Sequence, residues 1–209
     1  MNLYLAKIIP NPISLRDFSA SDVWGKDFVL DTSQITHVSA PSGTGKTTLS
    51  SILYGLRTDY TGVLKFKSDS SNNSMDWDVL RQNKIAVVFQ DLKLLPSLTA
   101  FENIAIKNNL TNHFSLSVIN KYAENLGVLD QLQKKCGDLS RGEQQRVAIL
   151  RSLCMPFTFL ILDEPFSHLD DANKKAAAEV IADVAIQNNA GICMLNLHED
   201  NCFKYDLRF

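Results

Sequence analysis

The sequence predicts an α/β domain: a mostly parallel sheet with helices on both faces, plus a small antiparallel β lobe and an inserted α-helical lobe. Apolar strand-like runs alternate with helical patterns, a glycine-rich loop joins one strand to one helix, and a long helical stretch interrupts the strands. With 209 residues, 45% of them hydrophobic, the chain can form one sizeable core. We therefore expect residues 1–209 to form a single domain.

The N-terminal part, about residues 1–39, is expected to form the antiparallel lobe. It holds three strand-like pieces, LYLAKII, DFVL and ITHVS, separated by residues that favour turns. A helix is predicted over 46–56, because Leu49, Ile52, Leu53 and Leu56 fall on one face. Next come a strand, GVLKFK, a polar loop over 68–76 and a short helix around 77–82.

The second half is expected to supply most of the parallel sheet. Residues 84–89, 157–162 and 191–197 are apolar runs of strand length, the pattern of buried strands. A helix with Val180, Ile181 and Val184 on one face lies between the last two runs. The helical lobe, about residues 91–155, is therefore inserted between core strands.

Composition excludes several classes of protein. The net charge is −2, so no global basic character points to a nucleic-acid partner. No apolar stretch is long enough to span a bilayer, and the N-terminus lacks the pattern of a signal peptide. The four cysteines form no C-x-x-C pair, which favours free thiols in a cytosolic protein. We expect a soluble cytosolic chain that needs separate subunits for any membrane role.

The glycine-rich loop matches a Walker A motif, with alanine in place of the first glycine. The residues expected to hold phosphate are Ala40, Pro41, Ser42, Gly43, Thr44, Gly45, Lys46, Thr47 and Thr48. Backbone N–H groups and a helix N-terminus bind anionic oxygens, so Lys46 is expected at the β- and γ-phosphates and the Thr47 hydroxyl at Mg²⁺. The alternative is a glycine- and serine-rich loop with a chance lysine. A Walker A loop alone leaves kinases, GTPases and ATPases open.

An acidic pair follows the predicted strand FLIL. A carboxylate at the end of a buried strand beside a phosphate loop suits Mg²⁺, and we assign this Walker B role to Asp163. Glu164 is then the candidate general base for the attacking water. The alternative is an acidic pair in a surface turn.

Several further motifs together resemble the ATP-binding-cassette (ABC) ATPases over about residues 20–205. The segment LSRGEQQRVAILRSL resembles the signature motif of that family, and SHLD, which ends at Asp170, resembles its D-loop. Gln90 matches the Q-loop glutamine, and His198 matches the switch histidine. The resemblance implies a P-loop NTPase with a RecA-like core, which binds ATP and Mg²⁺ and hydrolyses ATP. It also implies that Gln90 completes the Mg²⁺ and water shell, and that His198 contacts the γ-phosphate.

The resemblance further implies a head-to-tail dimer, in which the signature motif of one cassette contacts ATP held by the other. Ser140 and Gly142 would make those contacts. Ser140 and Glu143 also fit a capping box at a helix start, the purely structural interpretation of this segment. Arg141 departs from the usual glycine, and either strengthens phosphate contact or points into solvent; glutamine is common at the position of Glu143.

Family members stack an aromatic ring on adenine, and two residues of this chain are candidates. Trp24 is the first choice and Phe18 the alternative; either residue could instead serve packing in the small lobe.

The family includes transport subunits and non-transport ATPases. The segment FQDLKLLPSLTAFENI resembles transporter cassettes, most closely the bacterial lipoprotein-release and macrolide-export type. There, Leu94, Leu95, Pro96 and Leu98 would lie near the groove for a helix of a membrane subunit, unless they pack only inside the helical lobe. We therefore expect an ATPase subunit on the inner face of the membrane, docked through residues 90–104 and paired with a second cassette. A mechanical or regulatory clamp on a soluble or septal partner is the alternative, and a cassette that hydrolyses ATP poorly is a third possibility.

Overall fold

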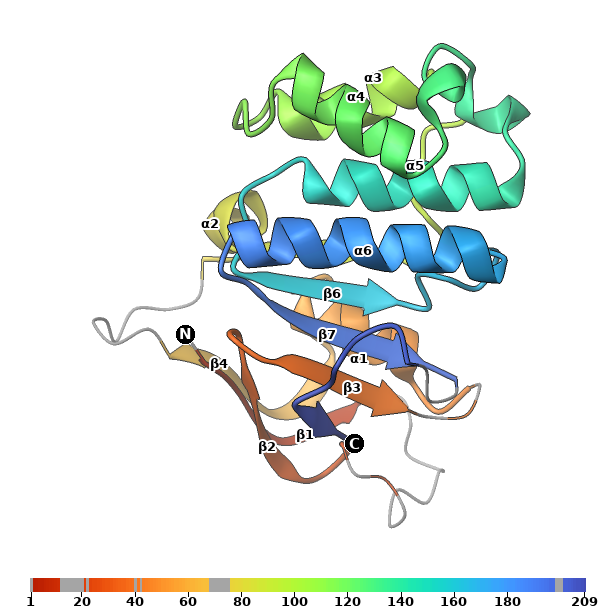
Figure 1. Ribbon diagram of the computed structural model, residues 1–209. Coiled ribbons are helices and arrows are strands. Elements are labelled where there is room, and N and C mark those ends of the chain that lie inside the picture. The colour runs from red at the N-terminus through yellow and green to blue at the C-terminus, as the bar shows by residue number, and fades with distance from the viewer. Residues whose placement is uncertain are drawn as a thin grey trace.

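The computed structural model describes residues 2–11, 21, 23–39, 41, 43–67, 76–197 and 201–209. The chain builds a central parallel sheet, with an antiparallel sheet and the helix α1 (Lys46–Leu53) beyond one face and the longest helices beyond the other (Figure 1). This architecture confirms the predicted α/β class with its antiparallel and helical additions.

The central sheet has five strands in the order β5-β6-β7-β3-β8, and every neighbouring pair is parallel. Its strands are β3 (Ile35–Ser39), β5 (Ile85–Val88), β6 (Phe159–Asp163), β7 (Gly191–Asn196) and β8 (Leu207–Arg208). All five residues of β6 are buried, because the strand is covered on both faces. The continuous apolar runs therefore predicted the buried strands of the second half.

The antiparallel sheet has the order β2-β1-β4, with β1 (Asn2–Pro10), β2 (Asp27–Asp31) and β4 (Tyr60–Lys67). The prediction for the first three strand-like pieces was wrong in one respect, because ITHVS is β3 and belongs to the central sheet. Its place in the lobe is taken by β4. The reason is that β3 leads into the phosphate loop and a helix, a crossover that requires parallel neighbours.

Side chains alternate across the central sheet and so divide the core into two clusters. Leu160 and Leu162 of β6 join the cluster that includes residues of α5 (Arg141–Leu153) and α6 (Asp171–Gln187). Phe159 and Ile161 join the cluster that includes α1 (Lys46–Leu53) and the antiparallel sheet. The predicted helix over 46–56 ends earlier than expected, and Leu56 lies beyond it and is exposed.

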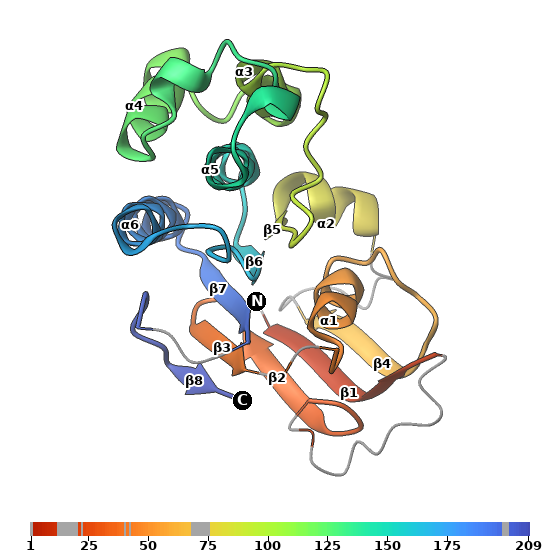
Figure 2. The same ribbon diagram turned by 90° about the vertical axis from the view of Figure 1, so that its right-hand side faces the viewer.

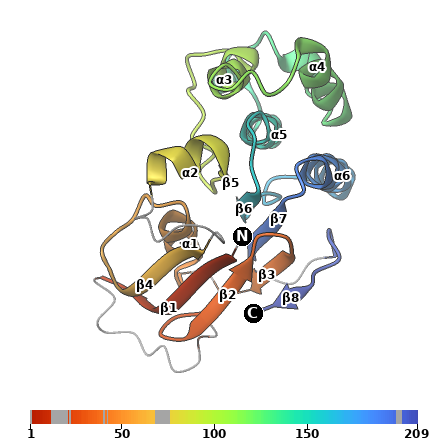
Figure 3. The same ribbon diagram turned by 90° about the vertical axis from the view of Figure 1, so that its left-hand side faces the viewer.

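The helical lobe forms the layer farthest from the antiparallel sheet (Figure 2). It contains α3 (Ala100–Asn108), α4 (Leu116–Asn125), two short 3-10 helices (Leu129–Gln131 and Cys136–Asp138) and α5 (Arg141–Leu153). A short helix, α2 (Trp77–Asn83), lies between this layer and α1, as the opposite view also shows (Figure 3). Among the helices of the described ranges, none combines the length and the apolar character needed to cross a bilayer.

Candidate nucleotide site

The phosphate loop leads from the end of β3 to the start of α1. Gly45 has φ +105°, a backbone conformation that residues with a side chain rarely adopt. A Cβ on Gly45 would also lie 3.0 Å from Cζ2 of Trp24. The loop therefore requires glycine at this position for two independent reasons.

Trp24 packs against the phosphate loop. Its Nε1 donates a hydrogen bond of 3.0 Å to the carbonyl oxygen of Thr44, and the residue is only 5% exposed. These contacts support the packing role that was the alternative for this residue. Its role as an adenine platform stays a prediction, and the other candidate, Phe18, lies outside the described residues.

Lys46, Gln90 and Glu164 meet beside the loop. Lys46 Nζ lies 3.4 Å from Glu164 Oε1, with side chains 6% and 12% exposed, and it donates a bond of 3.1 Å to the Pro41 carbonyl oxygen. Gln90 connects both sides of the site, because its Oε1 accepts from the Thr47 hydroxyl at 2.9 Å while its Nε2 donates to Glu164 Oε2 at 3.1 Å. Four residues from three motifs of the sequence therefore form one network, since Lys46 and Thr47 both belong to the phosphate loop.

Asp163 lies at the buried base of the site. Its Oδ2 accepts a hydrogen bond of 2.8 Å from the Ser50 hydroxyl, whereas its Oδ1 is buried without a hydrogen-bond partner among the described residues. Burial raises the pKa of the Asp163 carboxyl, and hydrogen bonds from Ser50 and Thr47 oppose this effect. A buried carboxylate oxygen with unused acceptor capacity, close to the Thr47 hydroxyl, suits a hard cation.

The donor set is compatible with Mg²⁺ in particular. No group of three or more His, Cys, Asp or Glu side chains that could hold a metal occurs in the part of the chain that the structure describes. Magnesium does not need such a group, since it is commonly bound by one or two carboxylates together with substrate phosphates and water. Asp163, Thr47 and Gln90 supply oxygens of the required kind.

The signature segment contains the whole of α5, which lies in a layer different from that of α1 (Figure 2). Ser140 and Glu143 form the predicted capping box: Ser140 Oγ accepts from the Glu143 amide, and Glu143 Oε2 accepts from the Ser140 amide at 2.8 Å. The Ser140 hydroxyl also donates to Glu143 Oε2 at 2.8 Å, and this bond, followed by the one from the Ser140 amide, lowers the pKa of the Glu143 carboxyl. The exposed Arg141 side chain donates to Gln144 of its own helix at 3.2 Å.

Close packing requires a glycine at position 142, and the sequence alone did not reveal this requirement. A Cβ at this position would lie 3.0 Å from the carbonyl oxygen of His168, in the segment that resembles the D-loop. Asp170, at the end of that segment, caps α6 by accepting from the Asn173 amide at 2.8 Å. That hydrogen bond lowers the pKa of the Asp170 carboxyl. The signature and D-loop segments are therefore neighbours within one chain.

Three other predicted site residues cannot be placed in this network. Ala40, Ser42 and His198 lie outside the described residues, so their roles stay predictions.

Two residues of the site region were missed at the sequence level. Ser50 bonds Asp163, and its position one helical turn after Thr47 was the available signal. Arg151 bonds the backbone just after Gln90, and no sequence pattern indicates this contact.

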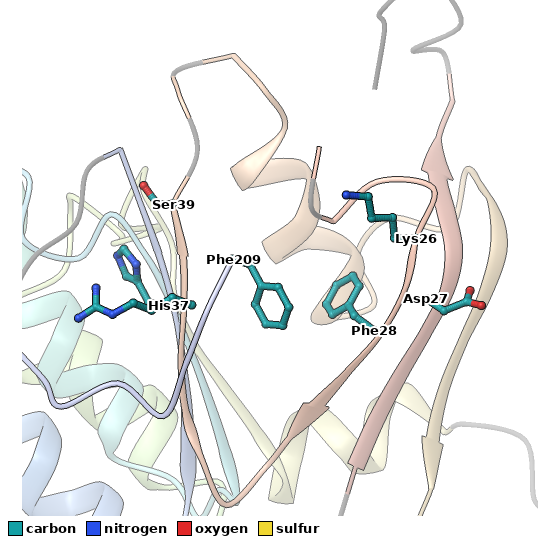
Figure 4. Close-up of a pocket in the computed structure, with 7 residues that line it drawn as sticks. Lys26, Asp27, Phe28, His37, Ser39 and Phe209 are labelled. Atoms are coloured by element: carbon teal, nitrogen blue, oxygen red, sulfur yellow. The ribbon is translucent and has the colours of Figure 1, made fainter. Parts of the chain in front are cut away.

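A separate cavity of about 480 Å³ lies between β2, β3 and the C-terminal segment (Figure 4). The rings of Phe28 and Phe209 approach each other there, with centroids 5.6 Å apart. Its lining contains none of Lys46, Gln90 or Glu164. The nucleotide site is therefore defined by the network around Lys46 and not by this cavity.

Comparison with known proteins gives the family. Residues 25–167 match the family model described as "ABC transporter". The chain belongs to the ABC transporter family. It is 40% identical to the glucose import ATP-binding protein GlcV of Saccharolobus solfataricus over 77% of this chain and 46% of that protein. It is 30% identical to the phosphonates import ATP-binding protein PhnC of Fusobacterium nucleatum, over 82% of this chain and 74% of that protein.

The fold of this ABC family member is also that of a solved cassette. The dimeric structure of MJ0796, described as a bacterial ABC transporter cassette, superposes with a TM-score of 0.77 at 20% identity, over 94% of this chain and 88% of that chain. The chain spans about half the length of several curated relatives, including GlcV at 46%.

Proposed function

We propose that this chain is the ATP-binding and ATP-hydrolysing subunit of an ABC transporter. The observation that carries the proposal is the network of Lys46, Gln90 and Glu164 above the buried Asp163. It gathers a phosphate-binding cation, a candidate base and oxygen ligands for a metal at one strand edge. Family membership supports ATP as the nucleotide.

Each residue has a separate chemical role in the proposed reaction. Lys46 and the loop amides bind the phosphates, and Glu164 accepts the proton of the attacking water, whose oxygen Gln90 orients. Asp163, Thr47 and Gln90 would hold Mg²⁺, which when bound stabilises negative charge on the phosphate. His198 would contact the γ-phosphate.

The partner for nucleotide binding is proposed to be a second cassette, most simply a second copy of this chain. The signature segment lies in a different layer from α1, so Ser140, Gly142 and the exposed Arg141 are available to a nucleotide on another cassette. Two ATP molecules buried between two cassettes would then hold the dimer together. Hydrolysis would release it.

The membrane partner is proposed to dock on residues 90–104. Leu95 is 48% exposed and Pro96 is exposed, so these residues do not pack only inside the lobe. The surrounding turn is anchored by the fully buried Asn103, which accepts from the Leu95 amide at 2.8 Å. An exposed apolar tip on an anchored turn suits an amphipathic helix of a membrane subunit.

Three finer points complete the proposal. We place the chain in the cytoplasm, on the inner face of the membrane, as one domain over residues 1–209 with a helical lobe over about 91–155. The resemblance of residues 89–104 favours the lipoprotein-release and macrolide-export type. The relatives GlcV and PhnC carry import in their names, so the direction of transport needs its own assay.

The first test is the mass of the Glu164→Gln variant by light scattering, with and without Mg-ATP. This variant keeps the phosphate-binding residues but loses the base, so bound ATP should persist and the mass should double. Lys46→Ala is the matched control, because it should lose nucleotide affinity and remain a monomer under the same conditions.

Two results would count against the proposal. A Glu164→Gln variant that hydrolyses Mg-ATP as fast as the wild type would remove the base assignment. An unchanged mass in saturating Mg-ATP would exclude a homodimeric clamp for the isolated chain. Co-purification with a soluble protein, and with no integral membrane protein, would favour the non-transport clamp.

A further inference from the structure

The strongest unassigned feature is the backbone immediately after Gln90. Leu92 has φ +60° and Lys93 has φ +48°, so two consecutive residues with side chains are left-handed. L-residues avoid this region because Cβ approaches the following carbonyl oxygen. Such a pair persists only where the surrounding structure fixes it.

Arg151 fixes this pair. It lies in the last turn of α5, and its guanidinium donates to the carbonyl oxygens of both residues of the pair: Nη2 to that of Leu92 at 2.6 Å and Nη1 to that of Lys93 at 2.7 Å. The guanidinium is planar and holds several donors in fixed directions, so it can bridge two successive carbonyls. Burial lowers the pKa of Arg151, as expected for a cation taken into the protein interior.

The other side of the segment is fixed to the nucleotide site. Phe89 packs edge-on against Tyr54, next to the end of α1, with ring centroids 5.6 Å apart. Gln90 then bonds Thr47 and Glu164. The stretch from Phe89 to Lys93 therefore connects the metal and water ligand Gln90 to the helix that begins with the signature motif.

We propose that Arg151 is a positioning residue that sets the place of Gln90 in the nucleotide site by clamping the left-handed turn at Leu92 and Lys93. It rests on the proposed ATPase function. Because Ser140 and Arg151 are at opposite ends of α5, a contact of the signature end with a partner's nucleotide moves the clamp as part of the same rigid helix. Arg151 thus makes the position of Gln90 depend on the position of α5.

The test combines Arg151→Lys with Gln90→Ala in a double-mutant cycle. Lysine keeps the charge, but its ammonium lacks the planar fork that bridges both carbonyls. We expect kcat for Mg-ATP to fall about tenfold with KM within twofold of the wild type, because the phosphate loop is intact. In the Gln90→Ala background the same substitution should change kcat less than twofold, since the group that it positions is gone.

A control on the same helix separates positioning from general loss of structure. Arg146 also bonds the backbone, donating to the Leu126 carbonyl oxygen at 2.9 Å, and also bonds Asn173, but it does not touch the Gln90 segment. Arg146→Lys should therefore change kcat by the same factor in the wild type and in the Gln90→Ala variant. Unfolding midpoints of all variants, measured in parallel, identify any that have lost their fold.

Hydrogen exchange gives a readout that does not depend on activity. Amides of residues 90–93 should exchange about tenfold faster in Arg151→Lys than in the wild type. In Arg146→Lys their exchange rates should be unchanged. Two results overturn the inference. One is that Arg151→Lys lowers kcat by the same factor with and without the Gln90 side chain. The other is that exchange at residues 90–93 is unchanged in Arg151→Lys. A wild-type chain without Mg-ATPase activity overturns the proposed function instead, and the exchange result then decides the role of Arg151.

Discussion

Replacing Glu164 with glutamine should strengthen the binding of ADP, a ligand that the chain does not hydrolyse. In the structure Lys46 Nζ contacts Glu164 Oε1 at 3.4 Å, and the two side chains are 6% and 12% exposed. A phosphate must compete with that carboxylate for the lysine. Hydrogen bonds to charged groups contribute about 1.5–3 kcal/mol, and about 1.4 kcal/mol changes an equilibrium constant tenfold. Glutamine keeps the size and removes the charge, so we expect the Kd for ADP to fall about tenfold.

Isothermal titration of ADP into the wild type and the variant measures this difference directly. Glu124→Gln is the matched control, because Glu124 is an exposed carboxylate on α4, and its removal should change the Kd less than twofold. An equal or weaker affinity for ADP in Glu164→Gln would refute the reasoning. The carboxylate would then not be a competitor for Lys46, and the short contact would contribute little to the energetics of the site.

Three further predictions concern stability and the signature segment. Asn103→Ala should lower the free energy of unfolding by about 3 kcal/mol, measured in urea, because loop groups bonded by its buried side chain lose their partners. Burial raises the pKa of Cys154 and Cys193 to about 12 from the ordinary 9.0, so above pH 9 the unfolded chain binds fewer protons and stability should fall, by about 1.4 kcal/mol per pH unit for each thiol. Gly142→Ala places a Cβ 3.0 Å from the His168 carbonyl oxygen, and ATPase activity should fall about tenfold while the Kd for ADP changes less than twofold.

Each of these predictions has its own control. Asn109→Ala, at the exposed C-cap of the same helix, should cost less than about 0.5 kcal/mol, and an equal cost would remove the role of the buried amide. A Cys154→Ala/Cys193→Ala variant should lose most of the alkaline slope. If that slope survives, it comes from the other groups whose pKa burial raises, namely Cys136, Tyr54, Tyr60 and Tyr122. If Gly142→Ala keeps full activity, the segment around His168 can move to accept the added methyl group without affecting the ATPase reaction.

The sequence predicted the buried strands and most helices because their signals are local. A continuous apolar run such as 159–163 can be satisfied only where both faces of a strand are covered, and a capping box such as that of Ser140 and Glu143 acts within one turn. The local sequence does not determine to which sheet β3 belongs. This placement depends on the crossover that follows it and on pairing with β7, far along the chain. The end of α1 before Leu56, in contrast, has a local signal that the predicted bounds missed: Gly55 has φ +71°, and the amides of Gly55 and Leu56 bond the carbonyl oxygens of Ile52 and Ser51, a glycine C-cap.

The individual residues of the candidate site could be predicted from the sequence, but the contacts between them could not. Motif spacing singled out Lys46, Gln90 and Glu164 individually, since each follows a strand or a glycine-rich turn. The hydrogen bonds that join them, and the clamp by Arg151, involve residues 43 to 74 positions apart in the chain. Distances of this kind are set by how the helical lobe packs on the sheet. Neither the hydrophobic periodicity nor the composition of the sequence indicates how that lobe packs.

The conformation of Glu164 explains how two adjacent carboxylates serve one site. Successive residues of an extended strand point to opposite faces of the sheet, so Asp163 and Glu164 would diverge if β6 simply continued. Glu164 has φ +48°, and its amide bonds the Leu195 carbonyl oxygen at 2.9 Å, so the chain turns immediately after Asp163. The turn leaves Asp163 bonded to Ser50 beneath the loop and brings Glu164 to Lys46 and Gln90. A left-handed glutamate is unfavourable in itself, and this turn places the proposed metal ligand Asp163 and the proposed base Glu164 in one site.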